Sequence, residues 1–129
     1  ADVEIFDIAR NECVEMPPLP SPVSNMGTAR RGETMLLVGG LNIEDEGSDE
    51  IIEYDFKTGR SKVIFNMEEE LAGCLCFYRE NTLIVIGSTG DDLNAVYCFD
   101  FLSNSCTKLP SIAEGRLFAC AIAVNMENI

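Results

Sequence analysis

The sequence predicts an all-β fold, and two observations lead to this class. Short apolar runs alternate with turn residues along the whole chain, which is typical of strands, whereas the periodicity of an amphipathic helix is nearly absent. The same strand pattern also recurs after about 45–50 residues. The 129 residues are 47% hydrophobic and 24% charged, which is a globular composition, and this length is typical of one domain.

About eleven short strands are expected, each an apolar run bounded by turn residues. In chain order they are 3–8, 13–16, 26–29, 35–38, 51–54, 61–65, 71–77, 83–86, 95–99, 106–109 and 117–124. The polar segments 30–33, 57–60, 79–81 and 102–105 carry Gly, Asn, Ser or Thr and are predicted to be hairpin turns.

The strands repeat in one register. An aromatic residue followed by aspartate occurs as Phe6-Asp7, Tyr54-Asp55 and Phe99-Asp100, at spacings of 48 and 45 residues. Upstream of the last two pairs, residues 34–40 align with residues 82–88. A period of about 45–50 residues with four strands in each unit is typical of a propeller blade.

Residues in the two central units carry a more specific pattern. The segment Leu37-Val38-Gly39-Gly40 is an apolar strand that ends in a glycine doublet, and Tyr54-Asp55 is followed by Thr58-Gly59. The pattern resembles the Kelch-repeat family, which implies a Kelch-type β-propeller with four-stranded antiparallel blades. The next unit departs to Gly87-Ser88 and Phe99-Asp100. The tryptophan of the family's fourth strand is replaced by Cys13, Ser61 and Cys106.

The motif residues are expected to be structural. Gly39, Gly40 and Gly87 stand where the backbone must bend, because only a residue without Cβ adopts positive φ at little cost. Each aromatic ring is expected to pack on a neighbouring blade. The aspartate that follows it is expected to accept hydrogen bonds from backbone N–H groups of the next turn.

The repeat divides the chain unevenly. Residues 1–20 are predicted to end one blade, 23–67 and 71–112 to form two full blades, and 116–129 to start another. This is about three blades' worth of strands, whereas propellers close with about four to eight blades. The chain is therefore expected to be part of a longer propeller, or half of a six-bladed ring formed by two copies.

Charge and composition exclude several functions. The chain has 22 acidic and 9 basic residues, a formal net charge of −13 and no histidine. Nucleic-acid binding needs clustered Lys and Arg, and triads with an imidazole base need histidine. No apolar run approaches the roughly 20 residues that span a bilayer, and no basic-then-apolar signal opens the chain. No cofactor and no metal are expected.

The six cysteines lie at 13, 74, 76, 98, 106 and 120, mostly within apolar runs. Free cysteine behaves as a small buried hydrophobe, so reduced thiols and a cytoplasmic location are expected. Cys74 and Cys76 share one strand face, but no second pair with suitable spacing completes a zinc site.

The candidate partner-binding residues lie mainly in acidic loops. The segment 44–50 holds five carboxylates but lacks the ligand order and flanking helices of a calcium loop. A solvated loop, a recognition loop for a basic partner and low-affinity cation binding stay open as interpretations. The resemblance implies that loops between second and third strands lie on a partner-binding face. The candidates are Glu44, Asp45, Glu46, Asp49, Glu50, Asp91, Asp92 and Arg116. Arg116 aligns with Pro22 and Glu70, and one arginine in three favours a basic or polar partner over an acidic peptide.

These observations predict a non-catalytic protein–protein interaction module. The resemblance implies that it is the substrate-recognition propeller of a ubiquitin-ligase adaptor, or alternatively an actin or cytoskeletal scaffold. Sugar-modifying enzymes also use Kelch-type propellers, but their copper chemistry needs histidine ligands, so no enzyme activity is expected.

Overall fold

The computed structural model describes residues 2–87, 93–115, 120–122, 124 and 126. These residues contain ten strands and no helix longer than one turn. The strands are β1 (Val3–Asp7), β2 (Glu12–Met16), β3 (Gly27–Arg31), β4 (Thr34–Val38), β5 (Ser48–Asp55), β6 (Ser61–Leu71), β7 (Leu75–Arg79), β8 (Thr82–Ile86), β9 (Val96–Asp100) and β10 (Ser105–Leu109). In this part of the chain, no helix is long and apolar enough to cross a membrane.

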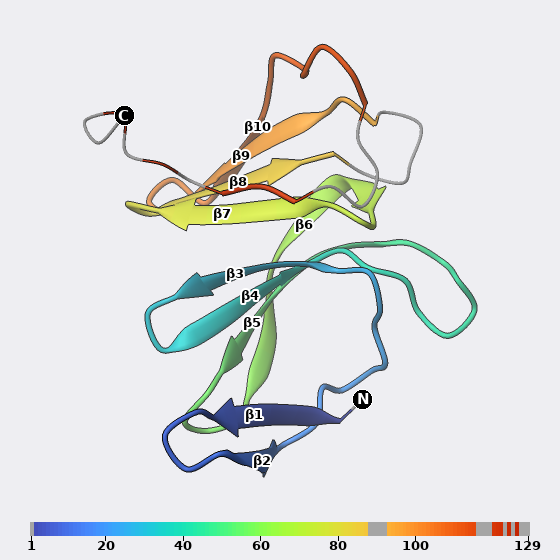
Figure 1. The fold of residues 1–129 in the computed structure, drawn as a ribbon. Helices are drawn as coiled ribbons and strands as arrows, with labels where there is room; N and C mark the ends of the chain where they lie inside the picture. The colour runs from blue at the N-terminus through green and yellow to red at the C-terminus, as the bar shows by residue number, and fades with distance from the viewer. Residues whose placement is uncertain (1, 88–92, 116–119, 123, 125, 127–129) are drawn as a thin grey trace.

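The strands form three antiparallel sheets, so the all-β class is confirmed. The strand orders are β1-β2, β3-β4-β5-β6 and β10-β9-β8-β7. Within each sheet, strands that are consecutive in the sequence lie side by side. Figure 1 shows the sheets stacked as layers, with the β1–β2 hairpin at one end and the β7–β10 sheet at the other. No sheet closes on itself among these strands.

The three aromatic–aspartate pairs each end a strand that leads into a hairpin. Asp7 Oδ1 accepts hydrogen bonds from the N–H groups of Ala9 and Arg10 at 2.9 and 3.1 Å. Asp100 Oδ1 accepts one from Leu102 at 2.8 Å. Each aspartate therefore holds the turn that follows its strand, as the motif predicts.

Asp55 makes the same contacts in the second hairpin. Its Oδ1 accepts hydrogen bonds from the N–H groups of Lys57 at 2.7 Å and Thr58 at 2.9 Å. The backbone N–H groups of Thr58 and Lys57 lower the pKa of Asp55, because they stabilise the ionised carboxylate. The turn closes at Gly59, which has a φ of 65°.

The glycine positions of the repeat have the predicted backbone conformation. Gly39, Gly40 and Gly87 have φ values of 61°, 109° and 72°. A Cβ added at Gly39 would lie 2.0 Å from the carbonyl oxygen of Leu71. Glycine is thus required at position 39 both by the left-handed backbone and by the close approach of β6.

Several expected strand boundaries are wrong. The strand expected at 71–77 does not exist as one element, because Leu71 ends β6 and β7 starts at Leu75. Between them, Gly73 has a φ of 65° and donates a hydrogen bond to the carbonyl of Asn25, which redirects the chain. The strand expected at 61–65 continues to Leu71, since the bulged register with β5 lets Leu71 pair with Ser48.

The strand expected at 51–54 also starts earlier. β5 begins at Ser48, so Asp49 and Glu50 lie in a strand rather than in the predicted loop. The strand expected at 117–124 falls partly outside the described residues. Those of its residues that are described, 120–122 and 124, are not in a strand.

The core lies between the two four-stranded sheets. Phe99 of β9 packs on Phe65 of β6 with ring centroids 4.8 Å apart, and on Phe101 at 4.9 Å. Successive side chains of a strand point to opposite faces, so each of β4, β5, β8 and β9 turns one row of side chains into this layer. The buried residues of the cluster are Ala29, Leu36, Val38, Ile51, Met67, Leu71, Cys74, Leu83, Val85, Ala95, Tyr97 and Phe99.

Candidate functional site: an acidic groove beside the β4–β5 loop

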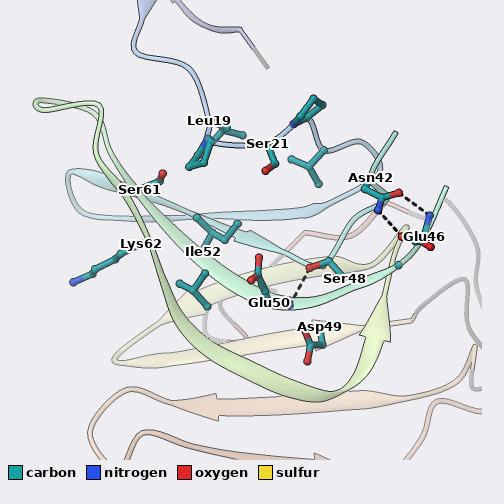
Figure 2. Close-up of a pocket in the computed structure, with 16 residues that line it drawn as sticks. Leu19, Ser21, Asn42, Glu46, Ser48, Asp49, Glu50, Ile52, Ser61 and Lys62 are labelled. Carbon is teal, nitrogen blue, oxygen red and sulfur yellow. Dashed lines mark hydrogen bonds between the residues drawn. The ribbon is translucent and has the colours of Figure 1, made fainter. Parts of the chain in front are cut away.

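An open groove with a volume of about 510 Å³ lies on the face of the β3–β6 sheet that is turned away from the β7–β10 sheet. One wall is the proline-rich segment 19–23, which links the first hairpin to β3. The opposite wall is formed by β5, which contributes the apolar side chain of Ile52 (Figure 2), and by β6. Val63 of β6 also lines this wall. Residues of the β4–β5 loop close one end.

The β4–β5 loop is organised around Asn42. The side-chain oxygen of Asn42 accepts hydrogen bonds from the N–H groups of Glu44 and Glu46, both at 2.9 Å. Its side-chain amide donates to Glu46 Oε2 at 2.9 Å (Figure 2). Asp45 takes a positive φ of 60° between them. Asparagine and aspartate tolerate this geometry and bond their own backbone, so the loop has a defined shape.

The structure brings three of the five predicted carboxylates of this loop into the groove wall. Glu46, Asp49 and Glu50 line the groove. Glu44 and Asp45 are exposed in the loop and do not line it. Asp91, Asp92 and Arg116 lie outside the residues that the structure describes.

These carboxylates are not neutralised by neighbouring cations. Within the described ranges, no Lys or Arg lies within ion-pair distance of Glu44, Asp45, Glu46, Asp49 or Glu50. Asp49 Oδ1 accepts a hydrogen bond from the Asn66 side chain at 3.2 Å. The N–H group of Glu50 donates to the Ser48 hydroxyl at 3.2 Å (Figure 2). The groove therefore has apolar walls and a negatively charged rim near the β4–β5 loop, whereas Lys62 lines its other end.

Lys62, which lines the groove, and Glu70 and Ile43, which lie beside the β4–β5 loop, were not among the candidates from the sequence. Glu70, at the end of β6, contacts Gly47, where an added Cβ would meet Glu70 Oε2 at 2.8 Å. Lys62 lines the opposite end of the groove. Ile43 is 75% exposed beside the carboxylates. The extension of β6 to Leu71 is what brings Glu70 to the loop, and no local sequence signal indicates it.

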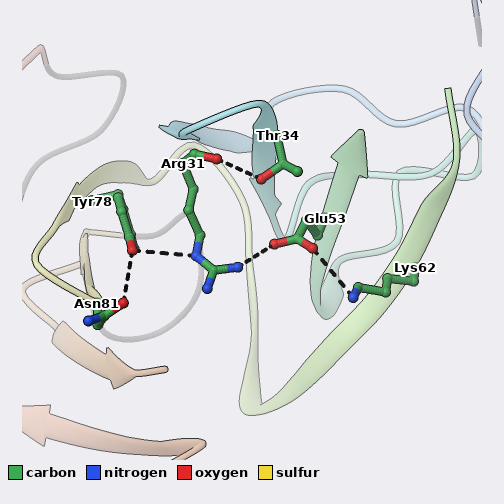
Figure 3. A network of polar contacts seen from close by, with 6 residues as sticks. All are labelled: Arg31, Thr34, Glu53, Lys62, Tyr78 and Asn81. Carbon is green, nitrogen blue, oxygen red and sulfur yellow. Dashed lines mark hydrogen bonds and ion pairs between the residues drawn. The ribbon is translucent and has the colours of Figure 1, made fainter. Parts of the chain in front are cut away.

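A second polar cluster joins the two large sheets. Arg31 of β3 donates to Glu53 Oε2 at 2.7 Å and to the Tyr78 hydroxyl at 3.4 Å (Figure 3). Its guanidinium lies 4.2 Å from the ring centroid of Phe101, and Glu53 also pairs with Lys62 at 3.5 Å. Hydrogen bonds to Tyr78 and Glu53 raise the pKa of Arg31. Arg31 and Glu53 belong to one sheet, whereas Tyr78 belongs to the other, so we interpret the cluster as a connection between sheets.

The cysteines are free thiols. Cys74 and Cys76 both contact Gly27, where an added Cβ would lie 2.6 and 2.5 Å from their sulfur atoms. A hydrogen bond to Cys74 and burial raise the pKa of Cys76, so this thiol stays protonated. No group of three or more cysteine or acidic side chains is arranged to hold a metal ion in the part of the chain that the structure describes.

Comparisons with known proteins bear on the fold. No family model and no curated protein matches the chain. Among solved structures, the chain is similar to one described as "Structure of YjhT", with a TM-score of 0.76 and 14% sequence identity. The match covers 91% of this chain and 40% of that chain. At this identity the similarity shows a shared arrangement of strands, and this chain spans less than half the length of that protein.

Proposed function

We propose that the chain is a segment of a Kelch-type β-propeller and that it acts as a non-catalytic protein-binding module. The stacked antiparallel four-stranded sheets, the repeated aromatic–aspartate hairpins and the glycine-ended strands β4 and β8 support the propeller. The match to 40% of a larger chain supports a set of strands that continues in a longer assembly, formed by one chain or by two copies. The link to a ubiquitin-ligase adaptor rests on the family resemblance.

The lining of the groove indicates the chemistry of the partner. Glu46, Asp49 and Glu50 form a rim that makes no ion pair with any residue described by the structure, and this rim lies beside an apolar wall that includes Ile52 and Val63. This arrangement favours a segment in which lysine or arginine side chains alternate with apolar ones. Carboxylates attract such a segment during encounter, and the burial of apolar area holds it afterwards.

The test compares two double variants within the acidic segment 44–50. Asp49→Asn with Glu50→Gln removes two charges from the groove and keeps a hydrogen-bond acceptor at each position. Glu44→Gln with Asp45→Asn removes two charges outside the groove, and asparagine tolerates the positive φ at position 45. A fluorescein-labelled peptide of alternating lysine and leucine serves as the probe, and fluorescence anisotropy reports its binding.

We expect the groove variant to weaken peptide binding about fivefold, since two lost charge contacts are worth about 1 kcal/mol together. The loop variant is expected to change the affinity by less than about twofold, and both variants should melt like the unmodified chain. Equal weakening by the two variants would show that the peptide responds to the net charge of the loop, and it would exclude the groove as the binding site.

A further inference from the structure

Two cysteine thiols meet beside a glycine at the interface between the two large sheets. Gly27 begins β3, Cys76 lies in β7, and these two strands contact each other across the interface (Figure 1). Cys74 directly precedes β7. A Cβ added at Gly27 would lie 2.5 Å from Cys76 Sγ and 2.6 Å from Cys74 Sγ. Both sulfur atoms therefore lie within 2.6 Å of one point.

Gly27 is needed here for space. It does not have a positive φ, so its backbone conformation is open to other residues. An added side chain would instead collide with both sulfur atoms. The absence of a Cβ at this position is thus what allows two thiols from the neighbouring sheet to approach the same place.

The surroundings of the pair are apolar but supply hydrogen bonds to one sulfur. Cys74 is 6% exposed and belongs to the buried cluster, and the half-buried Cys76 packs against it. The Cys74 thiol donates to the carbonyl oxygen of Val38 at 3.7 Å. A hydrogen bond from Cys76, together with the backbone N–H groups of Gly27 and Cys74, lowers the pKa of Cys74. These donors stabilise the thiolate, which is the form that binds metal ions.

The ligand set selects the kind of ion. Within the part of the chain that the structure describes, no third cysteine or acidic side chain joins the two sulfurs, and the sequence has no histidine. Structural zinc is held by four ligands, and calcium is held by oxygen atoms. Thiolates are soft ligands that favour Cu(I), and this ion is stable with only two sulfur ligands. Metal–thiolate bonds of about 2.3 Å match the spacing of the pair.

We propose that Cys74 and Cys76 form a two-coordinate Cu(I) site at the interface of β3 and β7. Each thiol releases its proton to solvent and forms one metal–sulfur bond, and no electron is transferred. The half-buried Cys76 gives the ion access from solvent, while the apolar cluster around Cys74 excludes water as a competing ligand. This site is separate from the acidic groove and does not depend on the function proposed for it.

The test titrates the reduced full chain with Cu(I) in the absence of oxygen, with bicinchoninate as a coloured competitor. Cys74→Ser and Cys76→Ser each remove one ligand with little change in size. The matched control is the double variant Cys98→Ser with Cys106→Ser, which removes two thiols from the same sheet. These two cysteines lie on neighbouring strands but in adjacent register positions, so they point to opposite faces of the sheet.

Gly27→Ala provides a third variant. It keeps both thiols and places a methyl group where the sulfur atoms meet. We expect either single serine variant to weaken Cu(I) binding by about a hundredfold or more, Gly27→Ala by about tenfold, and the control by less than about twofold. Unchanged affinity in the serine variants, or an equal loss in the control, would overturn the proposal.

A second measurement uses the unmodified chain and so does not depend on the folding of any variant. The tryptic peptide 63–79 contains Cys74 and Cys76 and no other cysteine, and the next peptide, 80–108, contains Cys98 and Cys106. Bound Cu(I) should protect the first peptide from alkylation by iodoacetamide before digestion and leave the second unaffected. Equal alkylation of peptide 63–79 with and without the ion would overturn the proposal. So would its recovery with an internal disulfide, because the pair would then be a site of oxidation.

Discussion

Equivalent positions of the two large sheets follow one sequence pattern but differ in burial. Leu36 and Val38 of β4 are completely buried, whereas Ile84 and Ile86, the equivalent residues of β8, are half-buried. The pairing registers place β4 residues 36 and 38 on the face that meets the β7–β10 sheet, and β8 residues 84 and 86 on the face turned away from the other two sheets. The same pattern of apolar residues therefore forms a core only where a neighbouring sheet covers it.

The arginines that end β3 and β7 also differ in burial. Arg31 of β3 bonds Glu53 and Tyr78 and stacks on Phe101 across the interface between the sheets. Arg79 is the equivalent residue of β7, has a 75% exposed side chain and pairs with the adjacent Glu80 at 3.4 Å. The arginine that ends the first strand of a sheet therefore joins a network only where a second sheet supplies an aromatic ring and a hydroxyl group, as Phe101 and Tyr78 do for Arg31.

The largest expected effect contrasts the two apolar faces. Leu36→Ala should lower the free energy of unfolding by about 3 kcal/mol, because it leaves a cavity in a closed layer. Ile84→Ala should lower it by about 1 kcal/mol, because the half-buried side chain loses less apolar contact. Urea denaturation of both variants measures this difference. Equal losses would mean that the outer face of the β7–β10 sheet is packed as tightly as the inner layer.

A smaller effect is expected from alanine at the glycine that ends β4. Gly39→Ala should lower the free energy of unfolding by about 2–3 kcal/mol, since alanine there combines a positive φ with a clash against the Leu71 carbonyl. Gly32→Ala is the matched control: its φ of 59° is similar, but nothing lies within 4 Å of an added Cβ. The control should cost about 1 kcal/mol. If the two losses in thermal stability agree, the approach of β6 to Gly39 is looser than described.

The smallest effect compares the two arginines. Arg31→Met should lower the free energy of unfolding by about 1.5 kcal/mol, because it removes a hydrogen-bonded ion pair and a cation–π contact. The half-buried Glu53 then lacks its arginine partner. Arg79→Met should change the stability by less than about 0.5 kcal/mol, as is usual for an exposed pair. Chemical denaturation at low and high salt separates the two variants. A negligible loss for Arg31→Met would show that the network does not hold the sheets together.

Local chemistry explains how much of the fold the sequence predicts. Ten of the expected strands correspond to strands of the structure, with shifted boundaries, because alternating apolar residues and turn residues act within a few positions of one another. The aspartate-held turns after Asp7, Asp55 and Asp100 and the positive φ of Gly39 follow for the same reason. Each of these features depends on one residue and its nearest backbone groups.

The site was predicted only in part. The acidic loop is visible as a run of carboxylates, but the run does not show that Glu46, Asp49 and Glu50 line a groove while Glu44 and Asp45 do not. That division depends on the hydrogen bonds of Asn42 and on the early start of β5. Glu70 reaches the loop only because a bulged pairing extends β6.

The sequence by itself thus determined the all-β class, the repeated hairpins and the positions where glycine and aspartate are needed. Only the tertiary structure decided which apolar face is buried, which arginine joins two sheets and which carboxylates line the groove. The physical reason is that propensity and turn geometry act between near neighbours in the chain. Burial and ion pairing depend instead on groups that the fold brings together from distant positions.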